Sequence, residues 1–331
     1  MCVMSKLAFK SELLFAEHAR LPAIKSWLLE NVWTRPRYQE SEPEQYLRGG
    51  EEAVYGLEEL IATGAQEVWG ELAAESRSAL TLKNWLGLDA PLPLAQPRAA
   101  VVFDGLSLRE FPLMLRLAED SGFRVKFAGA VATCLPTETM DFVEQRVIGT
   151  RLGPSQLPGR TELAERNVEA FYLEHPTSRY TATEGRSVLL WSTYPDRLFS
   201  DDAARTEALF ANFHRNYIPT IWKNSVQAVP RGLPIVVTSD HGYIFLGASF
   251  ETTRTSEAPG LLGQSRFKEF APEESFPQWN PDLQLIPERR VALLRGRLRT
   301  KPQGVSSRKL YQHGGCSLME VLVPWIELEP R

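Results

Sequence analysis

The sequence has few of the residues that would build a disulfide-linked or membrane-bound framework. Its 331 residues include three cysteines, Cys2, Cys134 and Cys316, which are too few and too scattered for a disulfide framework or a cysteine-type zinc site. No stretch approaches the ~18 uncharged apolar residues that a membrane-spanning helix needs. The first residues, soon broken by Lys10 and Glu12, do not form the apolar core of a signal peptide. We therefore expect a cytoplasmic protein in a reducing compartment, with no membrane partner.

An excess of charge of one sign is also lacking. The formal net charge is -4, which gives no global argument for nucleic-acid binding. With 43% hydrophobic and 24% charged residues, the composition is typical of a folded globular protein. The length allows one large domain, or one domain with an appendage.

Residues 1–97 are predicted to form an N-terminal helical region that ends in a linker. Apolar side chains recur at helical spacing over residues 11–29 and 51–72. Residues 89–97 hold three prolines in their last seven positions, which is typical of a linker.

After this linker, short apolar runs alternate with helical patterns, which predicts an α/β domain over residues 98–331. A parallel sheet covered by helices on both faces explains continuous apolar strands spaced by helices. Strands are expected over 99–103, 124–132, 187–191 and 235–238, and helices over 108–120, 163–173 and 203–221. Residues 251–310 break the alternation with Pro, Gly and Ser clusters and a two-strand pattern over 283–298. We expect an inserted β-rich subdomain or flap there.

Reactive polar residues follow four of the predicted strands. In an open parallel sheet, ligands bind outside the carboxyl ends of the strands, so these side chains should gather at one edge. Several carboxylates in one cleft repel each other, and a divalent cation removes that cost. Carboxylates with imidazole suit zinc, with manganese or iron as rivals. The residues are Asp104, Thr137, Thr139, Asp196, Asp240 and His241.

Each of these features also has an explanation that needs no metal. Asp104 could cap the N-terminus of a helix, and Thr139 could cap a helix that begins at Met140. Asp240 and Gly242 could belong to a tight turn. A late histidine, His313, stands before two glycines, which are common in turns. The ordered combination is harder to explain by structural needs, and it favours a metal-dependent hydrolase.

The chain resembles the alkaline phosphatase superfamily in four segments: Asp104-Gly105, Pro136-Thr137-Glu138-Thr139, Ser239-Asp240-His241-Gly242 and His313-Gly314-Gly315. The tail from His313 to Pro324 is especially similar to the PglZ branch, which occurs in phage-defence systems of the BREX and Pgl type. The resemblance spans residues 98–329. It implies an alkaline-phosphatase-like fold, a phosphate-ester substrate, two metal sites and other defence-system proteins as partners.

The resemblance also implies a role for each matching residue. One metal site would take Asp104, Asp240, His241 and Thr139, and Thr139 would be the nucleophile. The other would take Asp196 and His313 with a further histidine from a Pro-Asp-x-x-x-His run. This chain has Ser200 at that position, so the second site lacks one ligand. The substitutes near in sequence or elsewhere in the chain are Asp201, Asp202, His175 and His214.

Residues 289–309 contain no acidic residue, and Arg295, Arg297 and Arg299 alternate within them. In a strand these three side chains would share one face and could bind the phosphates of a substrate, including those of a nucleic acid. The alternative is a solvated edge strand that its charges protect from aggregation.

Three functions remain open from the sequence. The first is a zinc-dependent or manganese-dependent phosphodiesterase or phosphohydrolase that acts on nucleotide or nucleic-acid phosphodiesters in phage defence. The second is a catalytically degenerate domain that serves as a binding or scaffold module in a multiprotein defence complex. The third is the transfer or hydrolysis of a sulfate or phosphonate group on a small molecule.

Overall fold

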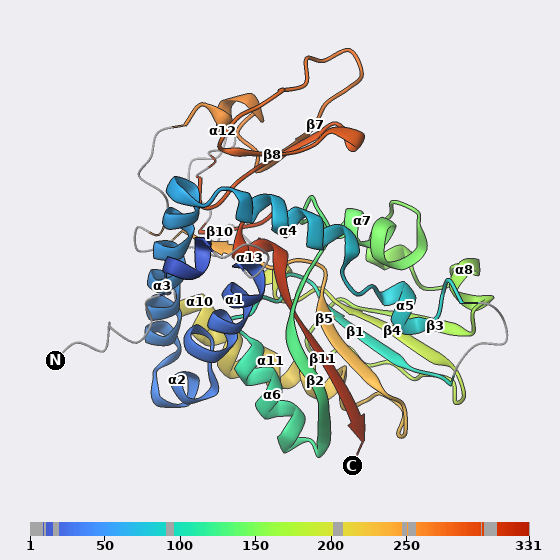
Figure 1. Cartoon of the computed structure of the whole chain (residues 1–331). Helices are drawn as coiled ribbons and strands as arrows, with labels where there is room; N and C mark the ends of the chain where they lie inside the picture. The colour runs from blue at the N-terminus through green and yellow to red at the C-terminus, as the bar shows by residue number, and fades with distance from the viewer. Residues whose placement is uncertain are drawn as a thin grey trace.

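The centre of the molecule is a six-stranded sheet, shown at the lower right of Figure 1 in the computed structural model. The structure describes residue 9 and residues 11–15, 20–90, 96–200, 208–246, 250, 256–298, 300 and 310–330. Within this part of the chain all strands of the sheet run in the same direction except β11 (Leu322–Pro330), which is antiparallel to both of its neighbours. The strand order is β2 (Phe123–Ala132), β11 (Leu322–Pro330), β5 (Ile235–Ser239), β1 (Ala99–Phe103), β4 (Ser187–Ser192) and β3 (Val168–Leu173).

The helices fall into a group that precedes the sheet and a group that alternates with its strands. The first group is η2 (Ser11–Phe15), α1 (Arg20–Trp27), η3 (Leu28–Val32), α2 (Arg35–Glu40), α3 (Pro43–Gly64), α4 (Glu67–Ser78) and α5 (Leu82–Leu86). The second is α6 (Phe111–Asp120), α7 (Thr139–Phe142), η4 (Val143–Ile148), η5 (Pro154–Gln156), α8 (Thr161–Ala164), α9 (Asp196–Phe199), α10 (Ala208–Asn212), η6 (Phe213–Tyr217), α11 (Ile218–Asn224) and α13 (Leu318–Val321). No helix in the described ranges combines the length and apolar character needed to cross a membrane.

The inner strands β1, β4 and β5 are buried on both faces, as their uninterrupted apolar runs predict. In β1, Ala99, Val101 and Phe103 join a hydrophobic cluster on one face, together with side chains of α6 and α11. Ala100 and Val102 point the opposite way, into a second cluster with α5, η4 and α8. A strand between two helical layers has no solvated side, so every position can be apolar. The predicted α/β fold class, with helices on both faces of a mostly parallel sheet, is confirmed.

Two features of the sheet differ from the sequence-based expectation. The segment 163–173, expected to be helical, forms the end of α8 and then β3. Parallel pairing with β4 along its whole length outweighs the helical spacing of its apolar residues. β11 was not expected at all, because its apolar run follows α13 directly. It inserts between β2 and β5, which makes the sheet mixed.

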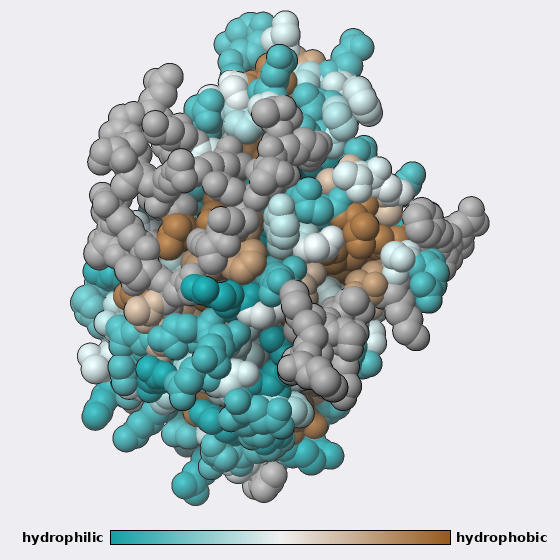
Figure 2. Space-filling view, turned by 90° about the vertical axis from the view of Figure 1, so that its left-hand side faces the viewer, coloured by the Kyte–Doolittle hydropathy of each residue, from teal (hydrophilic) through white to brown (hydrophobic). Residues whose placement is uncertain are grey.

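The N-terminal helices pack onto the sheet through one continuous core. Trp27, Trp33, Leu57 and Leu72 belong to the same buried cluster as the inner face of β1. The expectation of a helical region is confirmed in the described residues, while most of the predicted linker, residues 91–95, lies outside them. Figure 2 views the side where α2 and α3 lie in Figure 1, and the lower part of this face is mostly hydrophilic.

A separate three-stranded sheet stands at the top of Figure 1. In the sequence, the segment that forms this sheet lies between β6 (Ile244–Phe245) and β10 (Tyr311–Gln312). These two short strands pair with each other. We name residues 256–298 the three-stranded subdomain. Its elements are α12 (Ala258–Leu261), β7 (Phe267–Glu269), β8 (Leu283–Ile286), η8 (Pro287–Arg289) and β9 (Val291–Leu294). The predicted two-strand pattern over 283–298 corresponds to β8 and β9, and the chain leaves and returns at adjacent strands, as an insertion would.

A buried network of charges joins the N-terminal helices to the rest of the molecule. Glu51 and Glu58 of α3 are fully or almost fully buried, as are Arg109 and Arg297. Glu51 binds Arg109 at 2.5 Å and Arg297 at 2.7 Å, and Arg297 also binds Glu58 at 2.5 Å. Glu58 further accepts the backbone N–H of Leu318 at 2.8 Å. Each charge is therefore compensated only while α3 stays in place.

Replacing Arg297 with alanine should destabilise the protein by about 3–5 kcal/mol, because it leaves the buried Glu58 without a cation and leaves Glu51 with Arg109 alone. The measurement is the free energy of unfolding in urea. Arg124→Ala is the control, since Arg124 pairs with Glu329 on the exposed surface and should cost less than about 1 kcal/mol. Equal losses in the two variants would contradict the importance of the buried network.

Candidate metal centre

The parallel register of the central strands brings the predicted site residues together. Phe103, the last residue of β1, is level with Ser192 of β4 and Ser239 of β5. The residues that follow, Asp104 and Asp240, therefore leave the sheet side by side. The chain after β4 turns back, and the backbone N–H of Asp196 donates to the Asp104 carbonyl at 2.9 Å. Asp104, Asp196 and Asp240 therefore lie together at the carboxyl edge of the sheet, as predicted.

Asp104, Asp240 and His241 form a first group of potential metal ligands. One ligand atom from each lies within 4.8 Å of the others. His241 Nε2 is 3.5 Å from Asp104 Oδ1 and 3.7 Å from Asp240 Oδ2. This nitrogen is buried and has no hydrogen-bond partner among the described residues. A buried polar atom without a partner is costly, and a cation between the three atoms would satisfy it.

The remaining polar atoms of these three residues are held by the protein. Asp240 Oδ1 accepts the backbone N–H groups of Gly105 and His241, both at 3.0 Å. Asp104 Oδ2 accepts the indole N–H of Trp191 at 3.3 Å. His241 Nδ1 lies 2.9 Å from the Gly242 carbonyl and donates to it, which leaves Nε2 as the ring nitrogen that a metal could bind in place of a proton. The donor set and its orientation fit a divalent cation with oxygen and nitrogen ligands.

Thr139 lies against this group, at the first residue of α7. Its hydroxyl donates to Asp240 Oδ2 at 2.6 Å and lies 3.5 Å from Asp104 Oδ1. The residue before the helix, Glu138, is the N-cap, and no side chain caps this helix end. The alternative of Thr139 as a capping residue is therefore wrong. Asp104 does not cap a helix either, since α6 begins seven residues later with Glu110 as its N-cap.

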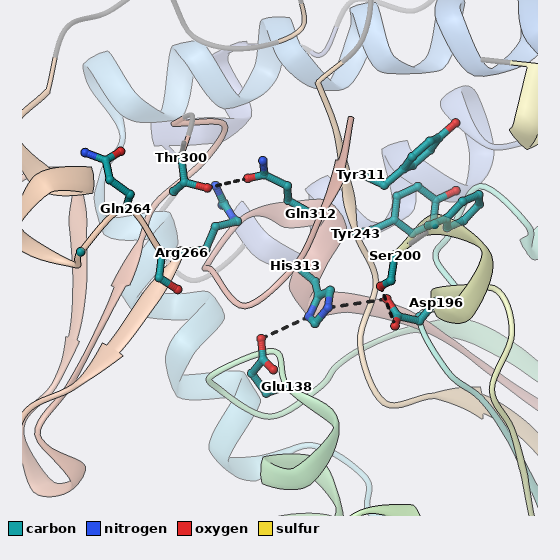
Figure 3. Close-up of a pocket in the computed structure, with 14 residues that line it drawn as sticks. Glu138, Asp196, Ser200, Tyr243, Gln264, Arg266, Thr300, Tyr311, Gln312 and His313 are labelled. Atoms are coloured by element: carbon teal, nitrogen blue, oxygen red, sulfur yellow. Dashed lines mark hydrogen bonds and ion pairs between the residues drawn. The ribbon is translucent and has the colours of Figure 1, made fainter. Parts of the chain in front are cut away.

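The second predicted group has His313 at its centre (Figure 3). His313 Nε2 is 3.6 Å from Asp196 Oδ1, and the Nδ1 atom contacts the Thr137 carbonyl at 3.0 Å and Glu138 Oε1 at 3.3 Å. The ring stacks on that of His241 with 4.0 Å between centroids. Asp196, His241 and His313 form a second possible ligand group, which shares His241 with the first.

Ser200, which replaces the histidine of the related pattern, has a different role here. Its hydroxyl donates to Asp196 Oδ2 at 3.0 Å and so orients the carboxylate that faces His313. Asp201 and Asp202 lie outside the described residues. His214 is buried between Tyr38 and Glu110, away from the second group, and His175 is exposed. In the described part of the chain, the second group therefore depends on a histidine that the first also uses.

The pKa values reflect carboxylates and imidazoles packed together without counter-ions. Burial, followed by the neighbouring Asp240, raises the pKa of Asp104 to about 7. Burial and His241 act to lower the pKa of His313, but Glu138 and Asp196 outweigh them and raise it to about 9. Burial likewise opposes the charged form of His241, yet Asp240 and Asp104 raise its pKa well above the usual range. Protons thus occupy positions that a cation would take.

A cavity of about 420 Å³ opens beside His313. Figure 3 shows Asp196, Ser200 and Glu138 near His313 on one side of the cavity. The other side is lined by residues of the three-stranded subdomain and by the segment that follows it. These are Gly263, Gln264, Ser265, Arg266 and Thr300. The size suits a small organic ligand, so the ligand groups lie beside a space that can hold a substrate.

Arg295 and Arg297, two of the three predicted substrate-binding arginines, do not form a phosphate-binding face. β9 ends at Leu294, so Arg295 and Arg297 are not on a continuous strand. Arg297 is buried and pairs with Glu51 and Glu58 inside the protein. Arg295 donates to the Pro281 carbonyl and to Gln284. For these two residues the expectation is wrong, because internal carboxylate and carbonyl acceptors take their guanidinium groups, and Arg299 lies outside the described residues.

Sequence reasoning missed two residues that touch the site. Glu138 was quoted only as part of a motif, although its carboxylate contacts His313. Trp191 was assigned only to a strand, although its indole N–H holds Asp104. Its place between Thr137 and Thr139, after a predicted strand, could have marked Glu138 as a residue of the site. Nothing in the sequence marks Trp191, since its role depends on the pairing of β1 with β4.

No family model matches the sequence, and no curated protein matches it. Among solved structures, murine ectonucleotide pyrophosphatase/phosphodiesterase 5 is similar, with a TM-score of 0.42 and 12% identity over 71% of this chain and 88% of that one. The human counterpart has a TM-score of 0.41 at 12% identity, with the same coverage of both chains. Phosphonoacetate hydrolase from Sinorhizobium meliloti 1021 has a TM-score of 0.37 and 12% identity over 70% of this chain and 89% of that one. A shared fold does not by itself determine function, and at 12% identity these likenesses assign no chemistry to this chain.

Replacing His241 with alanine should weaken zinc binding by about 100-fold or more, because loss of even an outer hydrogen-bond partner costs about 10–100-fold. Both ligand groups include His241, so both should suffer. The measurement is zinc per chain by elemental analysis after dialysis, with the exposed His175→Ala as the control. Unchanged zinc content in His241→Ala would place the metal elsewhere.

Zinc affinity should rise with pH between about 6 and about 8, because each proton that zinc must displace costs about tenfold per pH unit. With a pKa of about 9, His313 is mostly protonated at any pH below that value, and Asp104, with a pKa of about 7, is mostly protonated below pH 7. Competition titrations with a chelating dye at several pH values measure the slope. A flat profile would show that these groups are already deprotonated in the free protein.

Proposed function

We propose that the protein is a metal-dependent phosphodiesterase or phosphohydrolase with Thr139 as its nucleophile. The observation that carries the proposal is the hydroxyl of Thr139 at 2.6 Å from Asp240 Oδ2, beside the converging atoms of Asp104 and His241. A hydroxyl in this position is not a helix cap and is held by a carboxylate that could also ligate a cation. The metal is proposed to be zinc, with manganese as the alternative, and it would lower the pKa of a bound hydroxyl and neutralise charge on phosphate oxygens.

The protein residues then divide the chemistry between them. Thr139 loses its hydroxyl proton and its Oγ attacks phosphorus, while the bond from phosphorus to the leaving oxygen breaks and that oxygen takes up a proton. The phosphoryl group, with the other substituent of the diester, remains on Thr139 until water hydrolyses it. Asp240 Oδ2, which accepts the threonine hydrogen, orients the hydroxyl for attack. Asp104 is fixed by Trp191, so its free oxygen stays directed at the same point. Asp196 and His313 face the cavity, where the leaving group or the incoming water would lie.

The substrate is proposed to be a phosphodiester of a nucleotide or nucleic acid. A cavity of about 420 Å³ next to His313 supports a group of nucleotide size. The motif pattern, with the tail from His313 to Pro324, supports a PglZ-type protein of a phage-defence system, with other defence proteins as partners and a cytoplasmic location.

Ser200 supports a second proposed function. With serine in place of a histidine, the Asp196–His313 group has only His241 to complete it among the described residues. A domain that binds its ligand without turning it over, as a scaffold in a defence complex, would tolerate this loss.

Thr139→Ala should abolish metal-dependent hydrolysis of a chromogenic phosphodiester, lowering kcat by about 1000-fold or more, since the attacking oxygen is removed. Thr139→Ser keeps the hydroxyl and should retain measurable turnover. Zinc content should be measured in both variants to separate chemistry from metal loss. Full activity in Thr139→Ala would refute the nucleophile, and no activity in the zinc-loaded parent protein would favour the scaffold function.

A further inference from the structure

The three-stranded subdomain contacts the nucleophile loop through Arg289. Its guanidinium donates to the Leu135 carbonyl at 2.9 Å and pairs with the carboxylate of Asp141. These two acceptors flank the segment that carries Thr139, one on each side. Asp141 is buried, while Arg289 is about one quarter exposed. One side chain thus ties both ends of the loop to the subdomain.

A second bridge to the subdomain reaches the same aspartate. Arg151 Nη2 lies 3.1 Å from Asp141 Oδ2, and Arg151 Nη1 lies 2.7 Å from Glu269 of β7. Asp141 therefore sits between two guanidinium groups, one belonging to the subdomain and one bound to it. Paired charges of this kind hold a short helix such as α7 more firmly than its few backbone hydrogen bonds can.

The histidine loops have their own connection to the subdomain, through Arg266. Its guanidinium forms two 2.7 Å bonds to the Glu320 carboxylate, and both side chains are buried. Glu320 in turn accepts the backbone N–H of Gly315 on its side chain at 2.9 Å and that of Gly242 on its carbonyl at 2.8 Å. One acidic residue therefore contacts the residue after His241 and the loop of His313.

Gly315 packs closely against the guanidinium group of Arg266. A Cβ atom added there would lie 2.5 Å from Arg266 Nη2. The second glycine of the His-Gly-Gly motif is thus needed for the close approach of the arginine, and the motif and the subdomain are fitted to each other.

We propose that the three-stranded subdomain is a positioning element for the metal centre: Arg289 fixes the loop of Thr139, and Arg266, through Glu320, fixes the loops of His241 and His313. The contacts are structural facts independent of catalysis, while their effect on turnover rests on the function proposed above. Because a reactive group must be held to about 0.5 Å, loosening either loop should lower kcat while leaving KM nearly unchanged.

The first test is Arg289→Met, with Lys268→Met as the matched control. Lys268 is also about one third exposed and lies in the subdomain, but its ammonium pairs within the subdomain, with Glu274 at 2.8 Å. Backbone amide hydrogen exchange over residues 137–142 should become at least about tenfold faster in Arg289→Met and stay unchanged in Lys268→Met. Arg289→Lys, which can still reach Asp141, should recover part of the protection.

Equal exchange in Arg289→Met and the parent protein would overturn the proposal for this loop, whether or not the protein is an enzyme. If the parent protein turns over a phosphodiester, kcat should fall about 10–100-fold in Arg289→Met with KM within about threefold. A rise in KM alone would instead make the subdomain a substrate-binding wall and would also overturn the proposal.

The second test addresses Arg266 through the metal rather than through activity. Arg266→Lys keeps the positive charge but cannot form both bonds to Glu320. Cobalt titration of folded protein, checked by circular dichroism, should show about 10–100-fold weaker binding and an altered visible spectrum. An unchanged spectrum and affinity would overturn the role of Arg266. If the variant does not fold, Glu320→Gln provides a second comparison, because it keeps the size of the side chain and removes the charge that Arg266 binds.

Discussion

The site depends on the close approach of two carboxylates, Asp104 and Asp240, at the ends of neighbouring parallel strands. The register of β1 with β5 leaves them no freedom to separate. Burial and the repulsion from Asp240 raise the pKa of Asp104 to about 7, as expected where two carboxylates share one site. His241 and Thr139 contact the same oxygens, so the imidazole and the hydroxyl are placed by the two aspartates.

The two groups of potential metal ligands differ in how firmly the surrounding protein holds their polar atoms. In the first, backbone N–H groups, the Trp191 indole and the Gly242 carbonyl fix every atom that does not face the centre. The second has Asp196 and His313 at the wall of a cavity, and Ser200 orients the aspartate without adding a nitrogen ligand. We infer that a metal ion would bind more tightly to the first group than to the second, which faces the cavity.

The parts outside the sheet are joined to this centre by buried ion pairs. Glu51 and Glu58 of α3 meet Arg109 and Arg297, and Arg266 of the three-stranded subdomain meets Glu320. Such pairs are costly to break because each leaves an uncompensated charge inside the protein. The N-terminal helices and the subdomain therefore meet at α13, where Glu58 accepts the backbone N–H of Leu318 and Arg266 binds Glu320.

The sequence alone determined the strands that end in Asp104 and Asp240, the α/β class, and the identity of the metal-ligating candidates, because these follow from local apolar patterns and side-chain chemistry. It did not predict β3 or β11, since strand pairing outweighed helical spacing in the one and placed the other between distant strands. Only the tertiary structure decided that Arg297 is an internal counter-ion, while Glu138 and Trp191 contact the site. A side chain's partners come from segments far away in the sequence, and no local pattern records them.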